Sequence, residues 1–177
     1  PEQNFPSPSF VRQIENQNLH ALNIPELTII TPAALQTEAE RVAQLHREEG
    51  LTVAVIEQEK IFNEFSSGAP DASAYRRLMK MFYDRAEGNE NVRPRYLLLF
   101  GDGSYNNRKS MEKLHSPECN MLLTYQSKTS IDERESFVIE DYFGFLEDNS
   151  GEEIKVDKVC LGIGRFPISS IKNARLV

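Results

Sequence analysis

Tyr96-Leu97-Leu98-Leu99-Phe100-Gly101-Asp102-Gly103-Ser104 is the stretch that decides the fold. Its unbroken apolar run, with no polar alternation, is typical of a parallel strand buried on both faces. Leu98, in the middle of this run, is therefore expected to be a core residue. The run ends at Gly101-Asp102-Gly103-Ser104, which is turn chemistry. In open parallel sheets, the loops that leave such strand ends form the ligand crevice.

Apolar strands alternate with amphipathic helices on both sides of this stretch. Thr31-Pro32 resembles a helix start, with Thr31 as N-cap and Pro32 as the first helical residue. Helices are also expected over 57–65 and from Pro70-Asp71 to Gly88. The predicted strands cover 27–31, 51–56, 96–100 and 159–165. The alternation predicts an α/β fold, with one mostly parallel sheet and helices on both faces.

Composition limits the function classes. The 177 residues carry a formal net charge of −7, which argues against non-specific nucleic-acid binding. No apolar stretch approaches the roughly 20 residues of a membrane-spanning helix. Residues 1–26 are predicted to be a linker or edge segment, and 27–177 one domain. The start at Pro1 without Met, and a short helix before Val177, suggest a piece of a longer chain.

Residues 103–158 have no strong helical stripe and are predicted to be a long, loop-rich insertion at the carboxyl end of the central strand. Four side chains around this edge are candidates for structural or active-site rim residues: Asp102, Ser104, Asp141 and Arg165. In one interpretation, Asp102, Asp141 and Arg165 converge, and a carboxylate pairs with the guanidinium. In the other, Asp102 caps its own turn, Asp141 faces solvent and Arg165 pairs elsewhere. The residues favour neither.

No catalytic constellation is visible in the sequence. Cys119 and Cys160 have neither metal nor redox spacing, and no cofactor or metal is predicted. Asp148-Asn149-Ser150-Gly151 resembles a calcium loop only superficially and is read as a turn. Thr31-Pro32-Ala33-Ala34 stands where a dinucleotide binder carries its glycine-rich loop, which makes a nucleotide-binding function a weak third possibility.

Three motifs resemble, in order and separation, the N-terminal half of the gingipain-type cysteine peptidase domain: Phe100-Gly101-Asp102, Glu140-Asp141-Tyr142-Phe143-Gly144 and Gly162-Ile163-Gly164-Arg165-Phe166. Further segments, at 16–20, 62–72 and 123–127, look like those of the sortase members of this family, which serve the type IX secretion system of Bacteroidetes. The resemblance covers most of the chain from about Asn16 onward. The chain departs from the family at Ile139-Glu140, where Ser or Thr followed by Asp is usual.

The resemblance implies a caspase-like α/β fold, of which this chain is the first subdomain. It implies a sortase that removes the C-terminal signal of secreted cargo proteins and attaches them to anionic lipopolysaccharide. Outer-membrane proteins of the secretion complex are implied partners, and the implied location is the cell surface. In this family the Cys nucleophile and the His base lie in the second subdomain, so they are expected downstream of Val177. His20, His46 and His115 are outside the matching motifs, and the chain alone is expected to be inactive.

An alternative function belongs to a different class. The 103–158 insertion would then bind cargo or a partner of the secretion complex, with no catalytic role. A Gly-His pair and a Cys after apolar strands downstream of Val177 would favour the enzyme.

Overall fold

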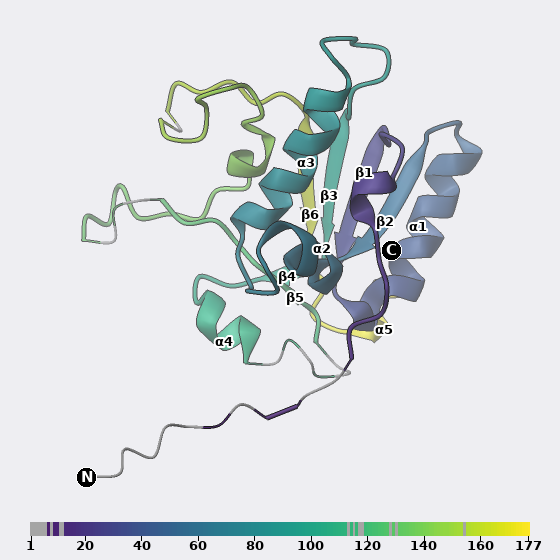
Figure 1. Ribbon diagram of the computed structural model, residues 1–177. Helices are drawn as coiled ribbons and strands as arrows, with labels where there is room; N and C mark the ends of the chain where they lie inside the picture. Colours follow the sequence, from purple (N-terminus) through teal and green to yellow (C-terminus); the bar gives the residue numbers. More distant parts are fainter. Residues whose placement is uncertain are drawn as a thin grey trace.

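A four-stranded parallel sheet, with the strand order β2-β1-β3-β6, forms the centre of the molecule (Figure 1). The computed structural model describes residues 9–10, 13–112, 119–127, 131–153 and 155–177, with the single residues 7, 114, 116 and 129. The strands are β1 (Leu27–Thr31), β2 (Val53–Glu57), β3 (Tyr96–Phe100) and β6 (Gly162–Phe166), and every neighbouring pair is parallel. The predicted α/β class and the predicted sheet are confirmed, with small shifts of the strand bounds.

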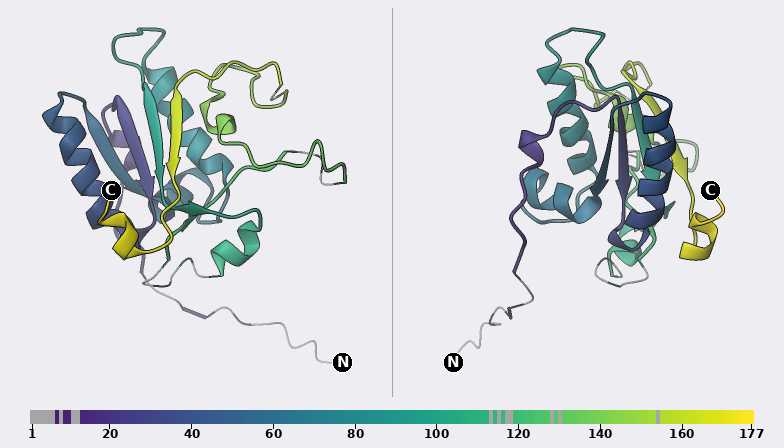
Figure 2. Two further views of the ribbon diagram at one scale, coloured as in Figure 1. Left: turned by 180° about the vertical axis from the view of Figure 1, so that it is seen from behind. Right: turned by 90° about the vertical axis from the view of Figure 1, so that its right-hand side faces the viewer.

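Helices cover both faces of this sheet, as the alternation predicted. Seen edge-on in Figure 2, one face carries α2 (Gln58–Phe65) and α3 (Ser73–Arg85), and the other carries α1 (Gln36–Glu48) and α5 (Ile171–Ala174). Successive residues of β3 point to opposite faces. Leu97 and Leu99 therefore belong to the cluster under α3, whereas Phe100 belongs to the cluster under α1.

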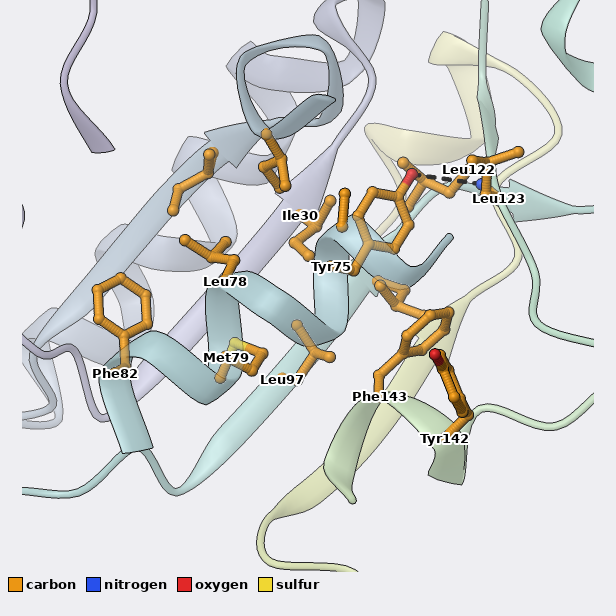
Figure 3. Packing of buried hydrophobic residues seen from close by; sticks show 14 of the residues in the cluster. Ile30, Tyr75, Leu78, Met79, Phe82, Leu97, Leu122, Leu123, Tyr142 and Phe143 are labelled. Carbon is orange, nitrogen blue, oxygen red and sulfur yellow. Dashed lines mark hydrogen bonds between the residues drawn. The ribbon is translucent and has the colours of Figure 1, made fainter. Parts of the chain in front are cut away.

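The larger of the two cores lies under α3. Side chains spaced by three and four residues line one face of this helix, as its sequence predicted. Tyr75, Leu78, Met79 and Phe82 are all fully buried there (Figure 3). Phe143, from the 3-10 turn η3 (Asp141–Gly144), closes the same core from the far end of the sheet.

Leu98 is only half-buried, which corrects the expectation that both faces of β3 are fully covered. Its neighbours in the sheet are Ile29 on β1 and Gly164 on β6, and Gly164 has no side chain to cover it. α1 lies over β1 and β2, and no helix lies over β3 and β6 on this face, as the rear view in Figure 2 shows. Tyr96 and Phe166, on the same face, are 40% and 37% exposed.

The start of the first helix also differs from the prediction. Thr31 is the last residue of β1, and its hydroxyl lies 3.2 Å from the carbonyl oxygens of both Pro32 and Phe100 instead of capping a helix. A 3-10 turn, η2 (Ala33–Leu35), comes before α1. Gly50 follows the end of α1, with a positive φ of 97° that L side chains rarely adopt.

The segment between β3 and β6 is rich in loops. It contains the short parallel pair β4 (Asp102–Gly103) and β5 (Met121–Leu122), the short helix α4 (Asn107–Met111) and η3. His115 and part of the polar stretch 128–136, namely Lys128 and Ser130, lie outside the described residues.

The segment before β1 packs on α2. The 3-10 turn η1 (Leu19–Ala21) places Leu19 in the core, with 8% of its surface exposed. The Glu64 carboxylate accepts hydrogen bonds from the backbone N–H groups of Leu19, at 2.7 Å, and His20, at 3.3 Å. The Gln17 amide donates to Glu64 as well, at 2.8 Å.

Candidate functional site

Arg165 forms the centre of a corner at the carboxyl end of the sheet. It leaves β6 on the α3 side, and only 11% of its side chain is exposed. Its Nε and Nη2 atoms donate to the two carboxylate oxygens of Glu140, at 2.7 and 3.1 Å. Nη2 also donates to the Leu123 carbonyl at 3.0 Å, and Nη1 to the Asp102 carbonyl at 3.2 Å. One guanidinium therefore fixes three chain segments that are distant in sequence.

A glycine makes room for this guanidinium. A Cβ atom at Gly103 would lie 2.9 Å from the Thr124 side chain and 3.3 Å from the Arg165 guanidinium carbon. Any larger residue would therefore displace one of the two. The absence of a side chain at Gly103, in β4, therefore permits this close approach.

The described contacts of Asp102, Ser104 and Asp141 decide between the two interpretations of this edge. The Asp102 carboxylate accepts from the N–H of Gly103 at 2.8 Å, within its own turn. The Ser104 hydroxyl accepts from the N–H of Asn106 at 3.1 Å. Asp141 is exposed. The carboxylate that pairs with Arg165 is that of Glu140. Of the two interpretations, the structure therefore matches the one in which Asp102 caps its own turn, Asp141 faces solvent and Arg165 pairs elsewhere, and Asp102, Asp141 and Arg165 do not pair.

Two buried side chains that the sequence did not single out hold the segment after β5. The Tyr75 hydroxyl, on α3, donates to Gln58 Oε1 at 2.7 Å and accepts from the Leu123 N–H at 3.3 Å (Figure 3). Gln58 Nε2, at the start of α2, donates to the Met121 carbonyl at 2.8 Å. Burial raises the pKa of Tyr75, so this hydroxyl stays protonated at neutral pH.

Asn107 holds the next residue of the same segment. Its side-chain amide donates to the Thr124 carbonyl at 2.7 Å and accepts from the Thr124 N–H at 3.1 Å. The amide thus pairs with Thr124 as a neighbouring strand would. No sequence signal could have identified Gln58, Tyr75, Asn107 or Glu140 as partners, because each bonds to backbone or side chains of another segment.

The cysteines and histidines described do not form a catalytic pair with one another. Cys119 is buried, with 3% of its surface exposed, and Cys160 is half-buried. The His20 ring lies 2.7 Å from Glu64, and the His46 ring lies 3.0 Å from Glu49.

Within the described parts of the chain, no group of three or more His, Cys, Asp or Glu side chains is placed so that it could hold a metal ion. No helix in those parts has the length and apolar character needed to cross a membrane.

The fold and the corner together define an α/β domain whose candidate site lies at the carboxyl end of a parallel sheet. The chain matches peptidase family C25 over residues 20–177. It also resembles the crystal structure of dimeric latent PorU from Porphyromonas gingivalis, with 43% sequence identity and a TM-score of 0.80. The similarity covers 92% of this chain and 16% of that one. No curated protein matches.

The chain therefore belongs to peptidase family C25, the gingipain family of cysteine peptidases. The resemblance seen in the sequence is confirmed, both for the family and for PorU. The chain spans about a sixth of the PorU structure that it matches, because the aligned region is 16% of that chain.

Proposed function

We propose that this chain is the non-catalytic first half of the peptidase domain of a sortase. The whole protein removes the C-terminal signal from cargo of the type IX secretion system and attaches the cargo to anionic lipopolysaccharide. The observation that supports this function is the 43% identity with PorU, maintained over 92% of the chain.

The chemistry of this proposal is acyl transfer. A Cys thiolate in the sequence downstream of Val177 attacks the peptide carbonyl, and a His donates a proton to the departing amine of the signal peptide. An amine on the lipopolysaccharide then attacks the thioester and releases the thiol. The present chain contributes an ordered wall, in which Arg165 and Glu140 hold the loops that leave β3 and β5.

The location and partners follow from the same proposal. The protein acts at the cell surface, on the extracellular side of the outer membrane, beside other proteins of the secretion complex. Secreted cargo with a C-terminal signal and the anionic lipopolysaccharide acceptor are its substrates.

The test of this function is a charge reversal in the whole protein, in its own bacterium. Arg165→Glu places a carboxylate against Glu140 and three backbone carbonyls, so cargo is expected to keep its C-terminal signal and to lack attached lipopolysaccharide. Lys155→Glu is the matched control. Lys155 pairs with Glu135, and 67% and 43% of the two side chains are exposed to solvent. Mass spectrometry of the cargo gives the readout, and intact processing by folded Arg165→Glu protein would contradict the proposal.

The isolated chain offers a second test. We expect it to hydrolyse no peptide and to form no adduct with an epoxide inhibitor of cysteine peptidases, as measured by intact mass under native conditions. Rapid stoichiometric labelling of Cys119 or Cys160, lost when one histidine is replaced, would place the catalytic pair inside this chain and contradict its non-catalytic role.

A second candidate function is a cargo- or partner-binding module built on the 103–158 insertion. A hollow of about 520 Å³ between this insertion and the start of α3 favours it. Two results together would favour the binding module over the peptidase half: the chain binds cargo, and the whole protein processes cargo even when this binding is lost.

A further inference from the structure

The hollow at the carboxyl end of the sheet is bordered by three separate segments. The loop before α3 contributes Pro70 and Ala72, α4 contributes Arg108 and Met111, and the extended segment after β5 contributes Leu123 and Tyr125. Its volume of about 520 Å³ lies within the range of about 300–1,000 Å³ that is usual for binding sites. Three of these six side chains, those of Met111, Leu123 and Tyr125, are large and apolar or aromatic, so the hollow favours an apolar group.

The wall formed by the segment after β5 is held in place before any ligand binds. Asn107 bonds to both backbone groups of Thr124, and Arg165 and Tyr75 hold Leu123. The Tyr125 ring stacks on Tyr142, with ring centroids 3.4 Å apart and the planes 5° apart. A wall fixed in this way loses little conformational entropy on binding.

The charges at the hollow favour an anionic group beside the apolar one. Asp71 is engaged, since its carboxylate accepts from the Ser73 hydroxyl at 2.6 Å and lies 3.4 Å from Arg77. Arg108 is exposed, and within the described residues its guanidinium has no ion pair. This positive charge stands out on a chain with a net charge of −7, and it lies on the turn of α4 next to Met111.

We propose that this hollow binds an extended peptide segment, taking one apolar side chain between Met111, Leu123 and Tyr125 and one adjacent carboxylate at Arg108. The inference rests on the proposed function, because the segment would come from the cargo protein. An apolar side chain next to an acidic one satisfies both features of the hollow, and a peptide presents the two at neighbouring positions.

The probe is a blocked six-residue peptide of glycine and threonine that carries one leucine next to one aspartate. Titrated into the isotopically labelled chain, it is expected to give saturable amide shifts that gather at 107–111 and 123–126. Replacing the leucine with glycine, or the aspartate with lysine, is expected to weaken binding at least fivefold. No saturable shift at millimolar peptide, or shifts elsewhere on the molecule, would overturn the proposal.

Charge exchange provides the specific control. Arg108→Glu is expected to weaken binding of the aspartate peptide at least fivefold and to restore binding of the lysine peptide. Arg134→Glu, an exposed arginine on the loop between β5 and η3, should change neither. Equal shifts with acetate or inorganic phosphate alone would show an anion site without peptide recognition and would overturn the proposal.

Cargo processing in the whole protein separates this inference from the function on which it rests. If the chain binds no peptide but the whole protein still processes cargo, the proposed peptide binding by the hollow is overturned and the sortase function remains. The opposite result is also possible: the chain binds the peptide, but no variant of the whole protein leaves cargo unprocessed. This result would support peptide binding by the hollow and would overturn the sortase function.

Discussion

Thr28 and Thr31 lie on the same strand, are both fully buried, and differ in what their hydroxyls contact. Thr31 Oγ1 lies 3.2 Å from the Phe100 carbonyl, whereas Thr28 Oγ1 has no hydrogen-bond partner in the described structure. A buried polar group without a partner costs free energy that a methyl group of the same size does not. We therefore expect Thr28→Val to raise the free energy of unfolding by about 1 kcal/mol, as measured by urea denaturation.

Thr31→Val is the control for this change. It removes a hydroxyl that has partners, so it is expected to lower the free energy of unfolding by about 1 kcal/mol. Equal losses for Thr28→Val and Thr31→Val would mean that the Thr28 hydroxyl is satisfied in solution.

The pair of Arg165 and Glu140 makes a second prediction at the scale of single residues. The pair is bidentate and largely shielded from water, with 11% and 27% of the two side chains exposed. A double-mutant cycle with Arg165→Gln and Glu140→Gln is expected to give a coupling energy of about 1.5–3 kcal/mol. The exposed pair of Lys155 and Glu135, treated in the same way, should give below about 1 kcal/mol. Equal coupling in the two cycles would contradict the shielding of the corner.

The sequence pattern pointed to Arg165 as a residue of this edge, but it did not identify Glu140 as its partner. Arg165 stands at the end of an apolar strand, and such positions meet at the crevice of a parallel sheet. Its partner depends on where the loop through Glu140 folds back, and no local pattern specifies that. Asp102 and Asp141 lie nearer to strand-like patterns, so the local sequence points to them before Glu140.

Among the elements, β3 has one closed face and one open face. Leu99 is fully buried under α3, whereas Leu98 is half-buried beside Gly164. Leu99→Ala is expected to lower the free energy of unfolding by about 2–5 kcal/mol, the usual range for a core leucine. Leu98→Ala should cost less, about 1–2 kcal/mol, because part of the side chain already contacts water.

Chemical denaturation of the two variants of β3 measures the difference. Equal losses would show that the open face of β3 is covered in solution, by association of the chain with itself or with another molecule. A larger loss at Leu98 would reverse the assignment of the two faces.

The contact between η1 and α2 predicts a dependence on pH. Burial alone would raise the pKa of Glu64, but hydrogen bonds from Leu19, Gln17 and His20 together hold it below its ordinary value of 4.5. A carboxyl group with a lowered pKa in the folded state stabilises that state above the ordinary pKa. This stabilisation is lost as the pH falls through the lowered pKa.

Glu64→Gln is therefore expected to lower the free energy of unfolding at pH 7 by about 1 kcal/mol, as for the loss of a helix cap. The difference from the unchanged chain should shrink as the pH falls below about 4.5. Glu133→Gln, at an exposed position, serves as the control. A difference that stays constant from pH 7 to pH 3 would mean that the carboxylate charge does not hold the segment.

Helices and strands with regular apolar spacing were predictable, because such spacing is a local property of the sequence. The buried stripe of Tyr75, Leu78, Met79 and Phe82 on α3 is the clearest case. The start of α1 was not, since Thr31-Pro32 fits both a helix start and the end of a strand. In the structure, Thr31 ends the strand, and its hydroxyl donates to the carbonyl of Phe100, which is far away in the sequence but lies on the neighbouring strand.

At the scale of the whole molecule, the fold class followed from the order of strands and helices, and the family from three spaced motifs. The boundary at residue 26 between a linker and a domain stays a prediction. Leu19, which precedes this boundary, packs in the core, and the match to the family begins at residue 20. The polar stretch 16–18 does not indicate that the Glu64 carboxylate binds the backbone of Leu19 and His20, which follow it.

The corner closed by Arg165 has a consequence for the order of events during synthesis. The Leu123 carbonyl and the Arg165 guanidinium are 42 positions apart in the chain. At a synthesis rate of about 5–20 residues per second, the carbonyl exists for about 2–8 s before its partner is made. During that time the loop beyond β5 lacks the Arg165 donor, and only the bonds from Tyr75 and Asn107, which are made earlier, are available to hold it. β6 is the edge strand of the sheet, and its synthesis supplies the Arg165 guanidinium that bonds to the Leu123 carbonyl.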